Sequence, residues 1–155
     1  MALPHHALVL VADGKKVLFL RNHGDQNQID LRTESHDFRH DRWNREIRTD
    51  APGTQSPRVG IARDTMEETD FHQQEEDRWV KEVAEELKKR ALRNDFEALA
   101  VVAPPRVLGT LRKELHKQVE RRVVLTLNKE MTDRPIPDIE ELLVGEAAPP
   151  AGANV

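Results

Sequence analysis

Short, unbroken hydrophobic runs near the start of the chain predict β-strands. Ala7–Ala12 is a continuous apolar run that ends at Asp13–Gly14, a dipeptide typical of tight turns, and Lys16–Leu20 resumes the apolar pattern at once. These two runs predict a β-hairpin. Gln28–Thr33 alternates apolar and polar side chains more weakly, and we expect it to form a third strand at the edge of a sheet.

The second half of the chain alternates helical and strand patterns. Apolar residues recur at helical spacing from Phe71 to Arg93, with charged residues on the opposite face, which predicts an amphipathic helix. The pattern then predicts, in order, a strand covered on both faces at Ala98–Ala103, a helix from Pro105 to about Gln118, a strand at Arg122–Leu127 and a short helix at Asp138–Val144.

A long polar segment separates these two halves. Ser35–Thr69 has no stable period and contains two clusters of turn-forming residues, Asp50–Gly53 and Ser56–Pro57, so we expect a long loop. Asp70 followed by Gln73 resembles a capping box, which predicts that the first helix begins just after Asp70.

The order of the predicted elements is three strands followed by two helix–strand units. This order is typical of an α/β fold with a mixed five-stranded sheet and a ribonuclease H-like or ribosomal-protein-like topology. The 155 residues suit one core, and a second globular unit is not expected. We expect a single domain over residues 1–146 that contains the polar loop 35–69, followed by a flexible tail at 147–155.

Composition divides unevenly along the chain. Residues 22–71 hold 11 of the hydrophobic residues in 50 positions, and the other 105 positions hold 47, which is an ordinary density for a folded core. The same window carries 7 Arg against 11 acidic residues, so the formal net charge of −4 resides there and the rest of the chain is neutral. The global charge therefore does not exclude a local contact with nucleic acid.

Several classes of protein are excluded or disfavoured by what the sequence lacks. There is no Cys, which excludes disulfides, thiolate zinc sites and a cysteine nucleophile. No apolar stretch is long enough to span a membrane, and the N-terminal apolar run has neither a preceding Lys or Arg nor a small-residue cleavage site. We expect a cytoplasmic protein with no membrane contact and no cofactor.

Acidic and imidazole side chains give little support for catalysis or metal binding. Asp13 is placed where a nuclease of this fold would hold one metal-binding carboxylate, but the neighbouring strand ends in Ala103–Pro105 and supplies no second acid. A role in the hairpin turn is the favoured interpretation of Asp13. His72 lies at the start of the first helix beside the long loop, near Glu75 and Glu76, and His36 and His40 are four positions apart. This spacing is only a weak signal for a metal site, because none of these residues forms a His-Glu-x-x-His pattern.

Basic residues offer the other candidate chemistry. Arg39 to Arg48 repeats arginine at every third position, but acidic residues are threaded through the same stretch, and internal ion pairing is favoured there. The second helix places Arg106, Arg112 and Lys113 opposite its apolar stripe, which suits a phosphate backbone. A solvated face whose lysines pair with neighbouring glutamates is the alternative, and the sequence favours it slightly.

Four stretches together resemble the bacterial host attachment protein family. They are Ala12–Gly14, Asp70–Glu75, Val102–Arg112 and Asn128–Thr132, of which the string Ala-Pro-Pro-Arg-Val-Leu-Gly-Thr-Leu-Arg ending at Arg112 is the most specific. The resemblance extends from Leu8 to Leu143 and is weakest over Arg32–Glu68; Val17 and Glu130–Met131 depart from the family pattern. The family in turn looks like a relative of the peptide-releasing domain of archaeal and eukaryotic release factors.

This resemblance implies the ribosomal-protein-like fold and a link to translation. In those release factors a Gly-Gly-Gln loop before the long helix acts in peptidyl-tRNA hydrolysis at the ribosome. The corresponding region here, Pro52–Ser56, lacks the paired glycines, so Gln55 is a candidate functional residue without an assigned catalytic role.

Two hypotheses of function follow. The favoured one is a non-catalytic interaction domain that associates with the ribosome or structured RNA, using Arg106, Arg112 and Lys113, and affects attachment to host cells indirectly. The alternative is a hydrolase of an ester bond in RNA or peptidyl-tRNA that uses the long loop and His72. The edge strand at Gln28–Thr33 leaves room for pairing in a homodimer.

Overall fold

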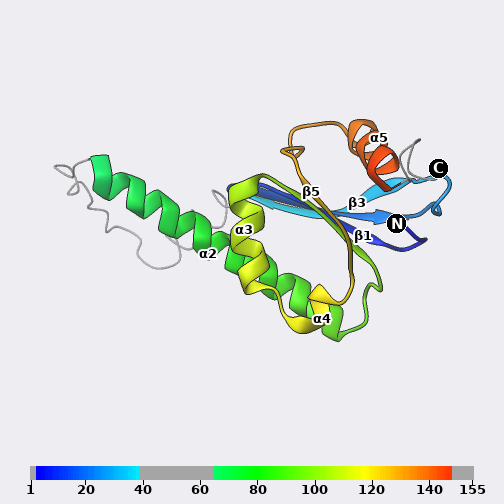
Figure 1. Ribbon diagram of the computed structural model, residues 1–155, viewed down its shortest axis with the longest axis horizontal. Helices are drawn as coiled ribbons and strands as arrows, with labels where there is room; N and C mark the ends of the chain where they lie inside the picture. The colour runs from blue at the N-terminus through cyan, green and yellow to red at the C-terminus, as the bar shows by residue number, and fades with distance from the viewer. Residues whose placement is uncertain (1–2, 39–64, 148–155) are drawn as a thin grey trace, which may run out of the picture.

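The computed structural model describes residues 3–38 and 65–147, and the chain folds around one β-sheet (Figure 1). Gln55 and the arginine series from Arg39 to Arg48 lie outside these residues. The candidates Asp13, His72, Arg106, Arg112 and Lys113 lie within them. In the described part of the chain, no helix is both long and apolar enough to cross a membrane.

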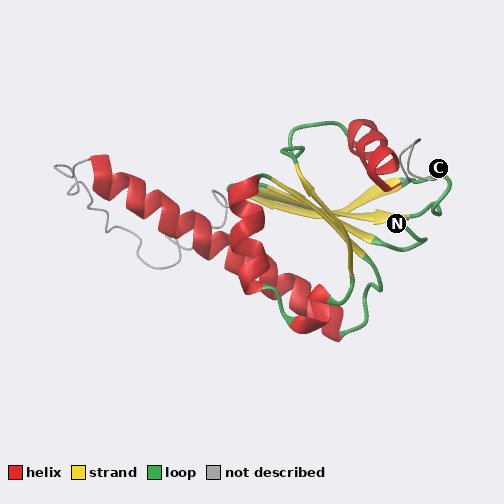
Figure 2. Ribbon diagram, viewed as in Figure 1, coloured by secondary structure: helices red, strands yellow, loops and turns green. Residues whose placement is uncertain are grey.

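The sheet is five-stranded and mixed, as the sequence predicts. Its strands are β1 (Leu8–Ala12), β2 (Lys16–Asn22), β3 (Leu31–Phe38), β4 (Leu99–Ala103) and β5 (Val123–Asn128), in the spatial order β3-β2-β1-β4-β5. The β1–β2 and β2–β3 pairs are antiparallel, whereas β4 runs parallel to both β1 and β5. Helices cover the two faces of this sheet (Figure 2).

More helices pack on one face of the sheet than on the other. One face packs against α2 (Thr65–Leu92), α3 (Pro105–Glu114) and the single turn α4 (Lys117–Glu120), and the other face packs against α5 (Ile136–Ala147). Trp79 and Leu87 of α2 contribute to the first core, and Ile139 and Leu143 of α5 contribute to the second. Every residue of β1 and β4 is buried, which confirms that these unbroken apolar runs are central strands covered on both faces.

The third strand lies at the edge, but it is shifted along the chain from the predicted Gln28–Thr33. The Asp25 carboxylate accepts the backbone N–H groups of Asn27 and Gln28, each at 2.8 Å, and the His23 N–H donates to the Asp30 carbonyl. These bonds hold residues 23–30 in a loop, so the strand begins at Leu31 and includes Ser35–Phe38, which the sequence analysis placed in the long loop. Pairing of this edge with a second copy stays a prediction.

The first helix begins earlier than predicted, at Thr65 instead of Phe71. Asp70 therefore lies inside α2, and the capping-box interpretation is wrong; the Gln73 side-chain amide donates instead to Asp77, one turn further on. The 28 residues of α2 correspond to about 42 Å of helix. Its first half projects beyond the sheet, and its buried positions in the described part begin at Trp79 (Figure 1).

The second helix ends sooner than the predicted Gln118. Leu115 has an extended backbone, and the His116 side chain then caps α4 by accepting the Gln118 N–H at 3.0 Å. Arg122, which follows α4, donates to the Ala91 carbonyl at 2.8 Å and to the Asn94 side chain at 3.0 Å. Arg122 thus stabilises the end of α2, and its guanidinium is committed within the chain.

Candidate functional site

Asp13 is occupied by hydrogen bonds in the β1–β2 turn. One carboxylate oxygen accepts the Lys15 and Lys16 backbone N–H groups, both at 2.7 Å, and the other accepts the Thr132 hydroxyl at 2.6 Å. The side chain therefore shapes the hairpin and fastens it to the loop before α5. Across the described residues, no group of three or more His, Asp or Glu side chains could hold a metal ion. These contacts support the turn interpretation of Asp13.

Glu76 of α2 joins the hairpin turn to the start of α3. Its carboxylate lies so close to Gly14 that a Cβ there would overlap it, and the same carboxylate pairs with the Arg106 guanidinium at 3.6 Å. The Arg106 side chain remains 65% exposed. Asp13 follows β1, and Arg106 follows β4 closely. Both therefore lie at the carboxyl ends of these two parallel strands, where ligands bind in many α/β folds.

His72 lies near Glu76 on α2. Among the described residues, it forms no hydrogen bond or ion pair with Asp13, Glu76 or Arg106. It is exposed on α2, one helical turn before Glu76, and its ring contacts that of Phe71 edge-on at 6.0 Å. Helical spacing places His72 and Glu76 on the same face of α2. The structure thus brings the hairpin turn of Asp13, Glu76 and Arg106 together at one end of the sheet, with His72 one helical turn away along α2, while Gln55 lies outside the described residues.

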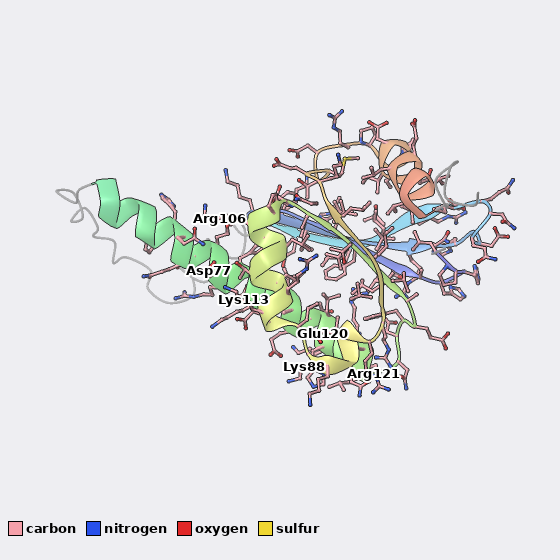
Figure 3. The ribbon with its side chains drawn as sticks, viewed as in Figure 1. Asp77, Lys88, Arg106, Lys113, Glu120 and Arg121 are labelled. Atoms are coloured by element: carbon pink, nitrogen blue, oxygen red, sulfur yellow. The ribbon has the colours of Figure 1, made fainter. Side chains whose placement is uncertain are left out.

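The exposed side of α3 and α4 carries a group of cations, which we call the basic face. Its members are Arg106, Arg112, Lys113, Lys117 and Arg121, all exposed. Figure 3 shows Arg106 and Lys113 on α3 and Arg121 directly after α4. Residues 105–122 contain six basic and two acidic residues. The opposite side of α3 buries Val107, Leu108 and Leu111, which confirms the predicted amphipathic stripe.

Most cations of the basic face form no ion pair, although Glu114 and Glu120 lie among them in the sequence. Apart from the Arg106–Glu76 pair, none of its members forms an ion pair with another described residue. Lys113 and Lys117 are thus not paired with Glu114 or Glu120, whereas the solvated face itself, the other part of the alternative interpretation, stays a prediction. Unpaired, solvated cations in one region attract anions with repeating charge.

A hollow of about 310 Å³ opens beside the basic face. Arg112, Glu120 and Thr126 supply the polar part of its lining, and the apolar part comes from α3, the residue after it and two strands: Val101, Leu108, Leu111, Leu115 and Val123. Its volume is at the lower end of the range for small-molecule sites. A flat apolar group could enter it while Arg112 holds an attached anion.

A buried ion-pair network that the sequence pattern did not predict lies at the other end of the sheet. Arg21 is only 6% exposed, and its guanidinium bonds both oxygens of Glu34, at 2.9 and 3.1 Å, and the Asp95 carboxylate at 2.9 Å. It also donates to the carbonyls of His6 and Asp95. Arg90 of α2 adds bonds to Glu34 and Asp95 while its guanidinium stacks 4.4 Å from the Phe19 ring centroid. The network joins β2, β3, α2 and the loop before β4.

A β-bulge positions Glu34 for this network. Phe19 pairs with Ser35 and Leu20 pairs with Thr33, so Glu34 is the extra residue in β3. The hydrogen bond from Arg21 holds the pKa of the Glu34 carboxyl below its usual range, against the opposing effect of partial burial. Burial opposes the charged form of Arg21, but the hydrogen bonds to Glu34 and Asp95 outweigh it and raise the pKa of the guanidinium.

The lowered pKa of Glu34 predicts a pH dependence of stability. The folded-state pKa of Glu34 lies below the unfolded value of about 4.3. The contribution of the ionised carboxylate to the free energy of unfolding is therefore fully present above the unfolded value, and it is lost as the pH falls through the folded-state pKa. The free energy of unfolding, measured with urea between pH 6.5 and 3, should fall at the acidic end. The fall should be shallower in Glu34→Gln than in the wild type. Glu130→Gln, at an exposed position after β5, is the matched control. An equally steep decline in Glu34→Gln and the wild type would contradict this assignment.

Comparison with known proteins gives one family match. One protein-family model matches residues 6–143, and it is described as bacterial archaeo-eukaryotic release factor family 12. No curated protein matches the chain. The matched range begins just before β1 and ends within α5, so it takes in the whole sheet and the basic face. The description does not mention host attachment, and that part of the sequence-based resemblance stays a hypothesis.

Proposed function

The chain belongs to bacterial archaeo-eukaryotic release factor family 12, and from that membership we propose that it is a non-catalytic, translation-linked domain that binds ribosomes or structured RNA. The observation that carries the proposal is the basic face, where four of the five cations, Arg112, Lys113, Lys117 and Arg121, have no carboxylate partner among the described residues. An effect on attachment to host cells would then be an indirect result of this activity.

Electrostatics favour a polyanion as the ligand of the basic face. Cations that neutralise phosphates release condensed counterions, so binding gains free energy at low salt and weakens steeply as salt rises. The chain as a whole carries −4, so attraction must come from the local excess of positive charge in residues 105–122. Contacts of this kind position a phosphate backbone without selecting a base sequence.

One further feature suits structured RNA. The hollow beside Arg112 offers an apolar surface on which an unstacked base could rest. The guanidinium of Arg112 would hold the phosphate of that nucleotide on the side away from Glu120, which also lines the hollow.

Binding measured directly tests the proposal. Purified protein should co-sediment with bacterial ribosomes and raise the fluorescence anisotropy of a labelled RNA hairpin, and both signals should fall as KCl is raised from 50 to 200 mM. With as few as three phosphate contacts, the affinity is expected to drop by about 20–40-fold over that range. If the protein binds neither the ribosomes nor the RNA hairpin at 50 mM KCl, the proposal is contradicted.

The hydrolase hypothesis keeps one supporting observation, the exposed His72 one turn from the Glu76–Arg106 pair. It is tested by incubating the protein with peptidyl-tRNA and with RNA, and comparing Gln55→Ala and His72→Ala with the wild type. The non-catalytic proposal expects no turnover above buffer for any of the three proteins. Turnover that Gln55→Ala or His72→Ala removes would replace it with the hydrolase.

A further inference from the structure

Gly109 occupies an unusual position in the middle of α3. It is exposed, and no described atom lies within 4 Å of the place where a Cβ would stand. Gly14 and Gly24 differ, because a Cβ would overlap Glu76 at the first and the Gln28 carbonyl at the second. Glycine weakens a helix interior relative to alanine. Packing within the described chain therefore gives no reason for a glycine at position 109.

The helical neighbours of Gly109 are three members of the basic face and a proline. Residues three and four positions away share its surface, and these are Pro105, Arg106, Arg112 and Lys113. The buried stripe of Val107, Leu108 and Leu111 lies on the other side of the helix. Gly109 thus leaves the helix backbone uncovered at this place, and the cationic side chains around it are long enough to reach beyond the backbone surface.

We propose that Gly109 is the point where the sugar–phosphate backbone of a bound RNA approaches α3 most closely. This inference rests on the proposed function. The missing Cβ lets a ribose or phosphate group reach the helix backbone, and Arg106, Arg112 and Lys113 surround the same group with positive charge. Any larger side chain at this position holds the RNA away from the helix and lengthens the contacts of all three cations at once.

The charge of the surrounding surface favours RNA as the occupant. A second copy of the chain would bring another basic face against this one, and like charges in direct contact oppose association. An acidic protein surface would satisfy the cations as well. Binding to protein components of the ribosome in the absence of binding to RNA is therefore a result that overturns the inference.

Two substitutions at Gly109 test it, because they separate stability from binding. Gly109→Ala and Gly109→Gln should both raise the Tm, by about 2 °C for alanine, since each is a better helix former and meets open space. Affinity for a fluorescein-labelled RNA hairpin should fall severalfold in Gly109→Ala and at least tenfold in Gly109→Gln. Weaker binding by a stabilised protein cannot come from misfolding.

Gly145 supplies the matched control. It is an exposed glycine in α5, and a Cβ there also meets no described atom within 4 Å. Gly145→Ala should raise the Tm similarly and leave RNA affinity unchanged. If the wild type binds the hairpin and both Gly109 variants bind equally well, this inference is overturned and the proposed function stands. If the wild type binds ribosomes but not the hairpin, only this inference is overturned; if it binds neither, both are overturned.

Discussion

Replacing Arg21 with Met is expected to lower the free energy of unfolding by about 2–4 kcal/mol, the largest loss that we expect from one polar side chain. The change keeps much of the buried volume but removes all the donors of the guanidinium. It leaves the Glu34 and Asp95 carboxylates facing each other without Arg21, and it leaves the His6 carbonyl without that donor. Both carboxylates are 34% exposed, so water and Arg90 offset part of the cost.

Urea unfolding followed by circular dichroism measures this loss. Arg32→Met is the matched control, because Arg32 lies on the neighbouring strand opposite Arg21, its side chain is 64% exposed, and its pair with Asp30 is a surface ion pair. The control should change the free energy of unfolding by less than about 0.5 kcal/mol. Equal effects of the two substitutions would show that the network contributes no more than an ordinary surface pair.

Reversing three charges of the basic face should produce the largest effect on binding. The triple variant Arg106→Glu, Arg112→Glu, Lys113→Glu is expected to bind ribosomes and structured RNA about 100-fold or more weakly than the wild type. Each reversal removes a cation that neutralises a phosphate and adds a repulsion, so the salt dependence of the affinity should become shallower by roughly one unit of slope per phosphate. Folding should persist, because the one ion pair that is broken, Arg106–Glu76, is long at 3.6 Å and its Arg106 side chain is 65% exposed.

A second triple variant separates the basic face from net charge. Arg32→Glu, Lys89→Glu, Arg134→Glu makes the same change in formal charge at exposed positions on β3, on the side of α2 that faces β3, and before α5. It should weaken binding only slightly. If both triple variants lose the same affinity, the overall field governs association and the basic face has no special role.

Much of the fold follows from local sequence pattern. The unbroken apolar run of β4 predicts a strand covered on both faces, whereas that of β1 predicts only one strand of a hairpin, and the structure buries both strands completely. The stripe of Val107, Leu108 and Leu111 predicts which side of α3 is buried and leaves Arg112 and Lys113 exposed. The helical spacing alone therefore predicts that the side chains of the basic face are exposed. It does not predict that most of them have no carboxylate partner.

The features that sequence analysis missed depend on contacts distant along the chain or on side-chain bonds in loops. The shift of β3 follows from the Asp25 bonds that hold residues 23–30 as a loop. The Arg21 network needs a bulge at Glu34 and a partner at Asp95, which is 74 positions from Arg21. Arg122 looks like part of a basic run in sequence, and only the fold shows that it caps α2.

Amide hydrogen exchange with and without a saturating RNA hairpin tests most directly whether the basic face is the binding surface. The single turn α4 and the end of α3 should exchange through local opening in the free protein, because short helices have little stability of their own. RNA binding should slow exchange over residues 106–121 and leave α5, at Ile136–Ala147, unchanged. Protection confined to other elements, with no change over residues 106–121, would contradict the account.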